Sequence, residues 1–148
     1  KSIMWRPKPI LSLNKPELQI KNILFDLQLT KKEIICIYPH YRLPVKFKSC
    51  LIADFYLLLY INYTIYPLII EFDGQKHHDH TFIYFKSNST KADIIKNNFA
   101  LLNSISIIRI TSIDAITFHM DKCIDHITKT RQFYTHLPTY QSYIQLLH

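Results

Sequence analysis

Glycine is nearly absent from this sequence, since Gly74 is the only one among its 148 residues. The abundant residue types are Ile, Lys, Asn, Tyr and Phe. Their codons are AT-rich, whereas those of glycine are GC-rich. The composition therefore indicates an AT-rich genome, such as that of a virus or a mobile element, and it bears on origin rather than on activity.

Cysteine is also scarce, with three residues that are odd in number and widely spaced (Cys36, Cys50 and Cys123). They form no CxxC pair, which excludes a disulfide framework and a structural zinc site. This usage favours a reducing, intracellular compartment, either cytoplasm or nucleus. No secretory signal is present at the start of the sequence.

Uninterrupted hydrophobic runs long enough for a membrane span are absent as well. The longest apolar stretch, 51–70, contains Asp54, Asn62 and Pro67 and runs directly into Glu71. We interpret it as two adjacent core strands rather than a span of about 20 residues. We therefore expect no membrane partner.

Acidic residues are the minority charge, because 18 Lys and Arg face 11 Asp and Glu, a formal charge of +7. A basic surplus favours a polyanionic partner, since Lys and Arg make most phosphate contacts. We expect DNA as the partner, with RNA as the alternative. The length and the 48% hydrophobic content suit one domain with one core over 1–148.

The pattern of caps, apolar spacing and turns predicts the order α-β-β-β-α-β-α. This is an α/β protein with a mixed four-stranded sheet flanked by helices, in which the strands before and after the second helix form a parallel pair. The predicted segments are an arm at 1–13, helices at 15–28, 90–103 (capped by Ser89 or Thr90, with Ile95, Phe99 and Leu102 inward) and 113–129, strands at 33–38, 51–60, 66–72 and 104–111, a basic loop at 41–49, a turn at 61–65, a polar stretch at 73–89, and a tail from 130 to 148 with a short helix at 139–147.

Two carboxylates stand in the two strongest strands, Asp54 in Ile-Ala-Asp-Phe and Glu71 in Ile-Ile-Glu-Phe-Asp-Gly. A carboxylate within an apolar strand is costly to bury unless it is paired or binds a cation. Antiparallel neighbours would place the two side by side, where Mg²⁺ is a suitable hard cation. Asp73 follows Glu71 by two residues, so strand alternation points it to the same face. We therefore predict a metal site formed by Asp54, Glu71 and Asp73.

The ordered set of motifs resembles the DUF559 and very-short-patch-repair group of the PD-(D/E)xK restriction-endonuclease-like superfamily. The resemblance covers about 15–128, and the residues that match its motifs are Glu17, Asp54, Glu71, Asp73, Gly74, His77, Asp93 and Arg109. It implies a restriction-endonuclease-like core and metal-dependent hydrolysis of DNA phosphodiester bonds, with Mg²⁺ as cofactor and Mn²⁺ as a substitute. Catalytic roles are implied for Asp54, Glu71, Asp73, His77 and Glu17.

One departure concerns the catalytic Lys of the superfamily, because Asp73 occupies its place two residues after Glu71. We predict that Lys96 replaces it, because Lys96 stands where the related proteins tend to have Arg. Gln75, Lys76 and His77 remain alternatives nearer in sequence, and the first two are also candidates for DNA contact. The other predicted contacts with nucleic acid are Arg42, Lys46, Lys48 and Arg109.

Several of these residues also have a purely structural interpretation. Glu17 stands at the third position of a capping box, which needs no catalytic role. Asp93 and Lys96 have the spacing of an ordinary ion pair on a helix surface. His77 belongs to a cluster with His78 and His80 that matches no zinc motif. The alternatives are an inactive nucleic-acid-binding domain and the nuclease-like module of a larger protein. A homodimer stays open as well, because double-strand cutting by one small active site often needs two copies.

Overall fold

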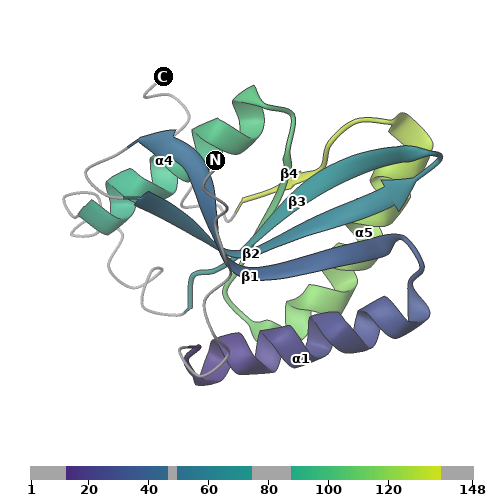
Figure 1. Cartoon of the computed structure of the whole chain (residues 1–148), viewed down its shortest axis with the longest axis horizontal. Helices are drawn as coiled ribbons and strands as arrows, with labels where there is room; N and C mark the ends of the chain where they lie inside the picture. Colours follow the sequence, from purple (N-terminus) through teal and green to yellow (C-terminus); the bar gives the residue numbers. More distant parts are fainter. Residues whose placement is uncertain (1–12, 47–49, 75–87, 138–148) are drawn as a thin grey trace, which may run out of the picture.

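The computed structural model describes residues 13–46, 50–74 and 88–137. Within them the chain is an α/β protein with a mixed five-stranded sheet and three helices (Figure 1). The elements in chain order are α1 (Lys15–Thr30), β1 (Ile34–Lys46), β2 (Cys50–Ile61), β3 (Thr64–Phe72), α4 (Asn88–Leu102), β4 (Ser106–Ile110), the 3-10 turn η2 (Ile113–Ala115), α5 (Ile116–Thr130) and β5 (Thr135–His136). The predicted order is confirmed, with one strand added at its end.

The strands lie in the order β1-β2-β3-β4-β5. β2 is antiparallel to both of its neighbours, β1 and β3. β3 and β4 form the predicted parallel pair, and β5 also runs parallel to β4. The prediction of four strands was wrong. β5 has two residues, too few for a hydrophobic pattern, and a hydrogen bond from the backbone N–H of Tyr134 to the Ser106 hydroxyl helps to hold this segment against β4.

β1 is much longer than the predicted strand, because it continues through the segment interpreted as a basic loop and ends at Lys46. The basic residues and Pro44 suggested a loop, but β1 lies at the edge of the described sheet, where a residue without an N–H donor is tolerated. Arg42 is exposed on this strand. Lys48 lies outside the described residues.

β2 and β3 form the predicted hairpin, with a turn shorter than expected. Asn62 and Tyr63 both have positive φ angles, 52° and 66°. Positive φ at both central residues is the geometry of a two-residue type I′ turn, which matches the twist of the flanking strands. The two strands therefore reach their full length, so that Asp54 and Glu71 come to lie at the opposite end of the ladder.

Helices pack on both faces of the sheet, α1 and α5 on one and α4 on the other (Figure 1). The larger core lies under α1 and α5 and includes Ile20, Leu24, Met120 and Ile127, all fully buried. The predicted capping box of α1 is present, since Asn14 Oδ1 accepts the backbone N–H of Glu17 at 2.9 Å. The helix therefore begins where the sequence predicted.

The inner face of α4 differs from the prediction. Leu102 is 78% exposed, whereas Asp93, Asn97 and Ala100 are buried. Polar side chains face the sheet here because β4 presents Arg109 to them. The helix begins at Asn88, so Ser89 and Thr90 lie inside it rather than capping it.

The structure also bears on the predictions about the cysteines and about membrane-spanning segments. Cys36 and Cys123 are free thiols, and burial raises the pKa of Cys123 to about 12, so this thiol is inert. Among the described helices, none combines the length and apolarity that crossing a bilayer requires. The predicted arm before Leu13 and the short helix at 139–147 lie outside the described residues.

Candidate functional site

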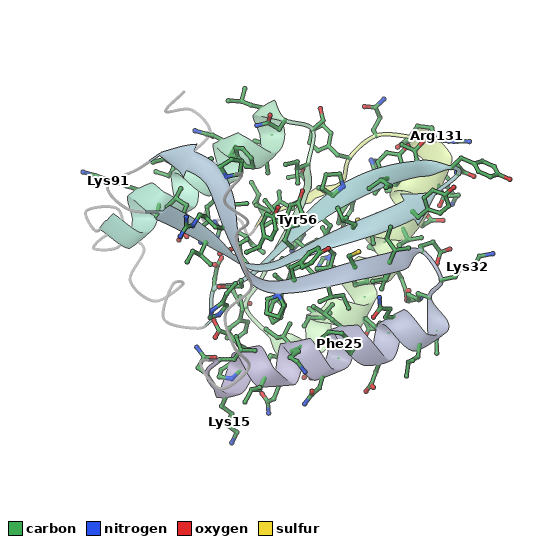
Figure 2. All side chains as sticks on the ribbon, viewed as in Figure 1. Lys15, Phe25, Lys32, Tyr56, Lys91 and Arg131 are labelled. Atoms are coloured by element: carbon green, nitrogen blue, oxygen red, sulfur yellow. The ribbon has the colours of Figure 1, made fainter. Side chains whose placement is uncertain are left out.

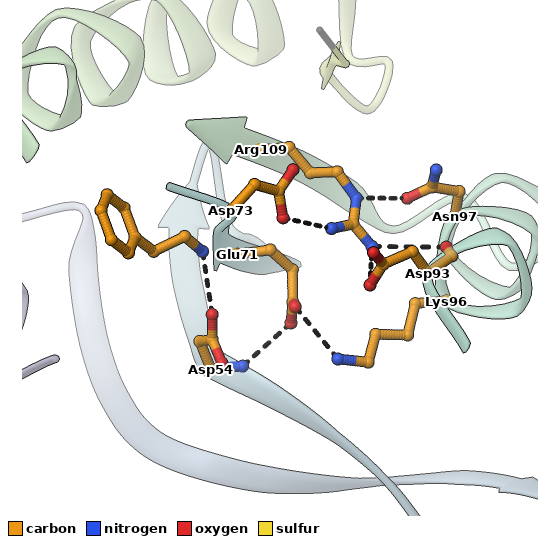
Figure 3. Close-up of polar contacts among 8 residues, drawn as sticks. Asp54, Glu71, Asp73, Asp93, Lys96, Asn97 and Arg109 are labelled. Carbon is orange, nitrogen blue, oxygen red and sulfur yellow. Dashed lines mark hydrogen bonds and ion pairs between the residues drawn. The ribbon is translucent and has the colours of Figure 1, made fainter. Parts of the chain in front are cut away.

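Asp54 and Glu71 meet where the β2–β3 ladder ends. The last paired residues are Phe55 and Ile70, so Asp54 and Glu71 are the next positions on the two strands. The Asp54 N–H donates to Glu71 Oε2 at 2.9 Å, and the Phe72 N–H donates to Asp54 Oδ2 at 2.8 Å (Figure 3). Each carboxylate thus caps a backbone donor of the opposite strand. This exchange fixes both side chains side by side, as the sequence predicted.

Lys96 reaches this pair from α4. Its Nζ lies 3.0 Å from Glu71 Oε1, and its side chain is largely buried (Figure 3). Burial alone would lower the pKa of Lys96, but the charges of Glu71 and Asp54 outweigh it, so the pKa is raised. Lys96 is therefore a cation at neutral pH rather than a base.

The charge on Asp54 is poorly compensated despite this cation. Burial and the neighbouring charge of Glu71 raise the pKa of Asp54 well above its usual value, and the charge of Glu17 adds to the effect. Lys96 and the Phe72 N–H act in the opposite direction without cancelling it. The charge of Glu17 on α1 therefore acts on Asp54 in the same direction as that of Glu71.

We expect Asp54→Asn to stabilise the protein at alkaline pH. A carboxyl whose pKa rises on folding favours the folded state at low pH, and this contribution is lost as pH rises towards the folded pKa. Asn removes the charge and keeps an acceptor for the Phe72 N–H. Thermal unfolding should therefore give a higher Tm for the variant near pH 8, with the difference shrinking towards about pH 4. An equal or lower Tm near pH 8 would contradict this electrostatic picture.

The fully buried Arg109 forms a second cluster of buried polar residues beside the pair. It lies opposite Glu71 in the parallel β3–β4 register. Its guanidinium donates to Asn97 Oδ1 and Asp73 Oδ1 at 2.7 Å each, and to the Asp93 carbonyl and carboxylate at 3.3 and 3.4 Å (Figure 3). These contacts tie β4, the end of β3 and α4 together and fix the helix that carries Lys96.

The structure brings together Asp54, Glu71 and Lys96, with Asp73 on the adjoining Arg109 cluster. Arg109 is fully buried, so it does not fit the predicted contact with nucleic acid. Gln75, Lys76 and His77 lie outside the described residues. Among described residues, no group of three or more His, Cys, Asp or Glu has an arrangement that could hold a metal ion.

The sequence interpretation missed two residues near the site, Asn97 and His40. Asn97 is four residues after Asp93, and this spacing was a usable sign of a polar helix face. His40 Nε2 lies 2.9 Å from Glu17 Oε1, a contact for which the sequence offered no sign.

Comparison with known proteins identifies the family. Residues 49–142 match a family of unknown function, DUF5889, and since they cover more than half of the chain, the protein belongs to this family. No curated protein and no solved structure matches the chain. The matched region contains Asp54, Glu71, Lys96 and Arg109, whereas Glu17 and His40 precede it.

Proposed function

We propose that this protein is a Mg²⁺-dependent nuclease of the restriction-endonuclease-like PD-(D/E)xK kind, with Asp54, Glu71 and Lys96 at its centre. One observation carries the proposal: Lys96 reaches Glu71 at 3.0 Å beside Asp54. An Asp, a Glu and a Lys therefore meet in space, although Asp73 occupies the sequence position at which the superfamily has its lysine. α4 supplies the missing cation.

The chemistry of the donors fits a divalent cation. Mg²⁺ in phosphate-processing enzymes commonly takes one or two carboxylates and completes its shell with waters and phosphate oxygens. Asp54 and Glu71 provide two such carboxylates at one ladder end, where burial and the charge of Glu71 raise the pKa of Asp54. When bound, the cation would activate water and offset charge on the scissile phosphate.

The residues of the chain have distinct roles in this proposal. Asp54 and Glu71 hold the cation, and their hydrogen bonds to backbone N–H groups preset their positions. Lys96 stabilises the negative charge that develops on the phosphate. Asp73 was predicted as a third ligand; because its carboxylate pairs with Arg109 at 2.7 Å, we assign it instead to anchoring Arg109.

Cleavage assays test this function. Plasmid and labelled single- and double-stranded DNA and RNA oligonucleotides are incubated with the wild type in Mg²⁺, in Mn²⁺ and in EDTA. We expect cleavage with either metal and none in EDTA. Cutting that persists in EDTA would remove the metal from the account.

A second candidate is a nucleic-acid-binding domain without catalytic activity. The observation in its favour is that the carboxylates already have partners, since Asp54 and Glu71 bond backbone N–H groups and Lys96 offsets the charge of Glu71. Such a cluster is stable without a metal ion. Binding of DNA or RNA by a folded protein that neither cleaves nor binds Mn²⁺ in calorimetry would favour this candidate.

A further inference from the structure

His40 on β1 faces the candidate site. In the antiparallel β1–β2 register, Pro39 pairs with Phe55 and Tyr41 pairs with Ala53. His40 therefore lies at the position opposite Asp54. Residues opposite one another in an antiparallel pair are close neighbours, so β1 adds a third strand to the place where Asp54 and Glu71 meet.

Two features of His40 oppose folding. Its φ is 51°, in the left-handed region that is uncommon for residues other than glycine. Its side chain is only 8% exposed, and the described residues offer no hydrogen-bond partner to its Nδ1. Buried polar atoms are nearly always paired, and strained backbone persists mainly where a site requires it. Both costs fall on one residue beside the carboxylates.

The contact that His40 does make is with Glu17. His40 Nε2 lies 2.9 Å from Glu17 Oε1, and both side chains are largely buried. The same oxygen accepts the backbone N–H of Asn14 at 3.0 Å. The Glu17 carboxylate is therefore held from two sides, by the start of α1 and by the middle of β1.

Glu17 also lies close to the strand position of Asp54. Its carboxylate contacts His40, and His40 occupies the β1 position opposite Asp54 in the β1–β2 ladder. A capping box alone needs only the contacts between Asn14 and Glu17, which this helix already has. The bond to His40 thus goes beyond capping and fixes where the Glu17 charge lies relative to Asp54.

We propose that His40 is a positioning residue, which holds Glu17 beside Asp54 so that a third carboxylate strengthens cation binding at the Asp54–Glu71 pair. This inference rests on the proposed function. Groups that orient the surroundings of a metal site, without binding the metal, commonly change metal affinity by about 10- to 100-fold when they are replaced. His40 and Glu17 would then act as one unit.

The test is a double-mutant cycle with His40→Asn and Glu17→Gln. Asn tolerates the left-handed backbone but is too short to reach Glu17, whereas Gln at position 17 keeps the capping geometry and loses the charge. We measure Mn²⁺ affinity by calorimetry without DNA, the Mg²⁺ concentration for half-maximal cleavage, and the Tm. Each single variant should bind Mn²⁺ about 10- to 100-fold more weakly than the wild type. The Mn²⁺ affinity of the double variant should be no lower than the lower of the two single-variant affinities.

Two further variants separate positioning from general stability. His40→Gln places an amide donor near the position of Nε2 and should restore most of the Mn²⁺ affinity. His119→Asn is the matched control, because His119 is a buried histidine on α5 whose Nδ1 lies 3.3 Å from the Tyr134 hydroxyl. It should lower the Tm and leave Mn²⁺ affinity unchanged.

The outcomes distinguish this inference from the proposed function. If the wild type binds Mn²⁺ and cleaves, but His40→Asn lowers only the Tm, then His40 is structural and the inference is overturned. Additive losses in the double variant would overturn it as well. If the folded wild type neither binds Mn²⁺ nor cleaves, the proposed function fails, and the role of His40 at a cation site fails with it.

Discussion

Arg109→Met is expected to lower the free energy of unfolding by about 3–5 kcal/mol, because it leaves buried carboxylates without their cation. Asp73 and Asp93 are 5% and 8% exposed, and both lie within 3.4 Å of the guanidinium. Chemical denaturation monitored by circular dichroism gives the value. In a chain of this length the Tm should fall by roughly 10 °C.

Two companion variants identify the cause of this loss. Arg42→Met changes an exposed arginine and should shift stability by less than about 0.5 kcal/mol. Adding Asp73→Asn to Arg109→Met removes one of the stranded charges and should recover part of the loss. If the double variant is less stable than Arg109→Met alone, unpaired charge is not what destabilises the protein.

Lys96→Met is expected to reduce kcat by about 10²- to 10³-fold, with a smaller change in KM. The ammonium lies 3.0 Å from Glu71 and is the group that we assign to charge developing on the phosphate. An interaction made mainly in the transition state affects kcat more than substrate binding. Steady-state cleavage of a labelled oligonucleotide in Mg²⁺ measures both constants.

The matched control for this variant lies on the same helix. Lys91 on α4 is exposed and points away from the sheet (Figure 2). Lys91→Met removes the same charge from the same helix and should leave kcat within about twofold of the wild type, since the charge of an exposed lysine is screened by solvent and salt. Equal losses in the two variants would show that only overall charge matters, which would contradict the role of Lys96.

The sequence predicted the parts of the fold that depend on local patterns. The capping box at Asn14 and Glu17 predicted the start of α1, and two apolar runs interrupted by a single carboxylate predicted β2 and β3. Because Asp54 lies near the start of the first run and Glu71 near the end of the second, antiparallel pairing brings them to one end of the ladder, and their meeting was also predictable. Lys96 was identified through a family resemblance, and the structure then placed it at Glu71.

The parts that the sequence did not predict depend on tertiary contacts. The second half of β1 has the proline and charges of a loop, but it lies at the edge of the sheet that the described strands form, where a proline without an N–H donor is tolerated. The inward face of α4 is polar because Arg109, 12 residues after Asn97, is buried against it. An arginine within the run Ile107-Ile108-Arg109-Ile110 was a sign that buried partners were needed.

The most direct test of the central claim is plasmid cleavage by the wild type and by Glu71→Ala, each in Mg²⁺ and in EDTA. Circular dichroism confirms that both proteins are folded. A nuclease centred on Asp54 and Glu71 predicts cutting only by the wild type and only with Mg²⁺. Metal-dependent cutting that survives unchanged in Glu71→Ala would contradict the assigned site.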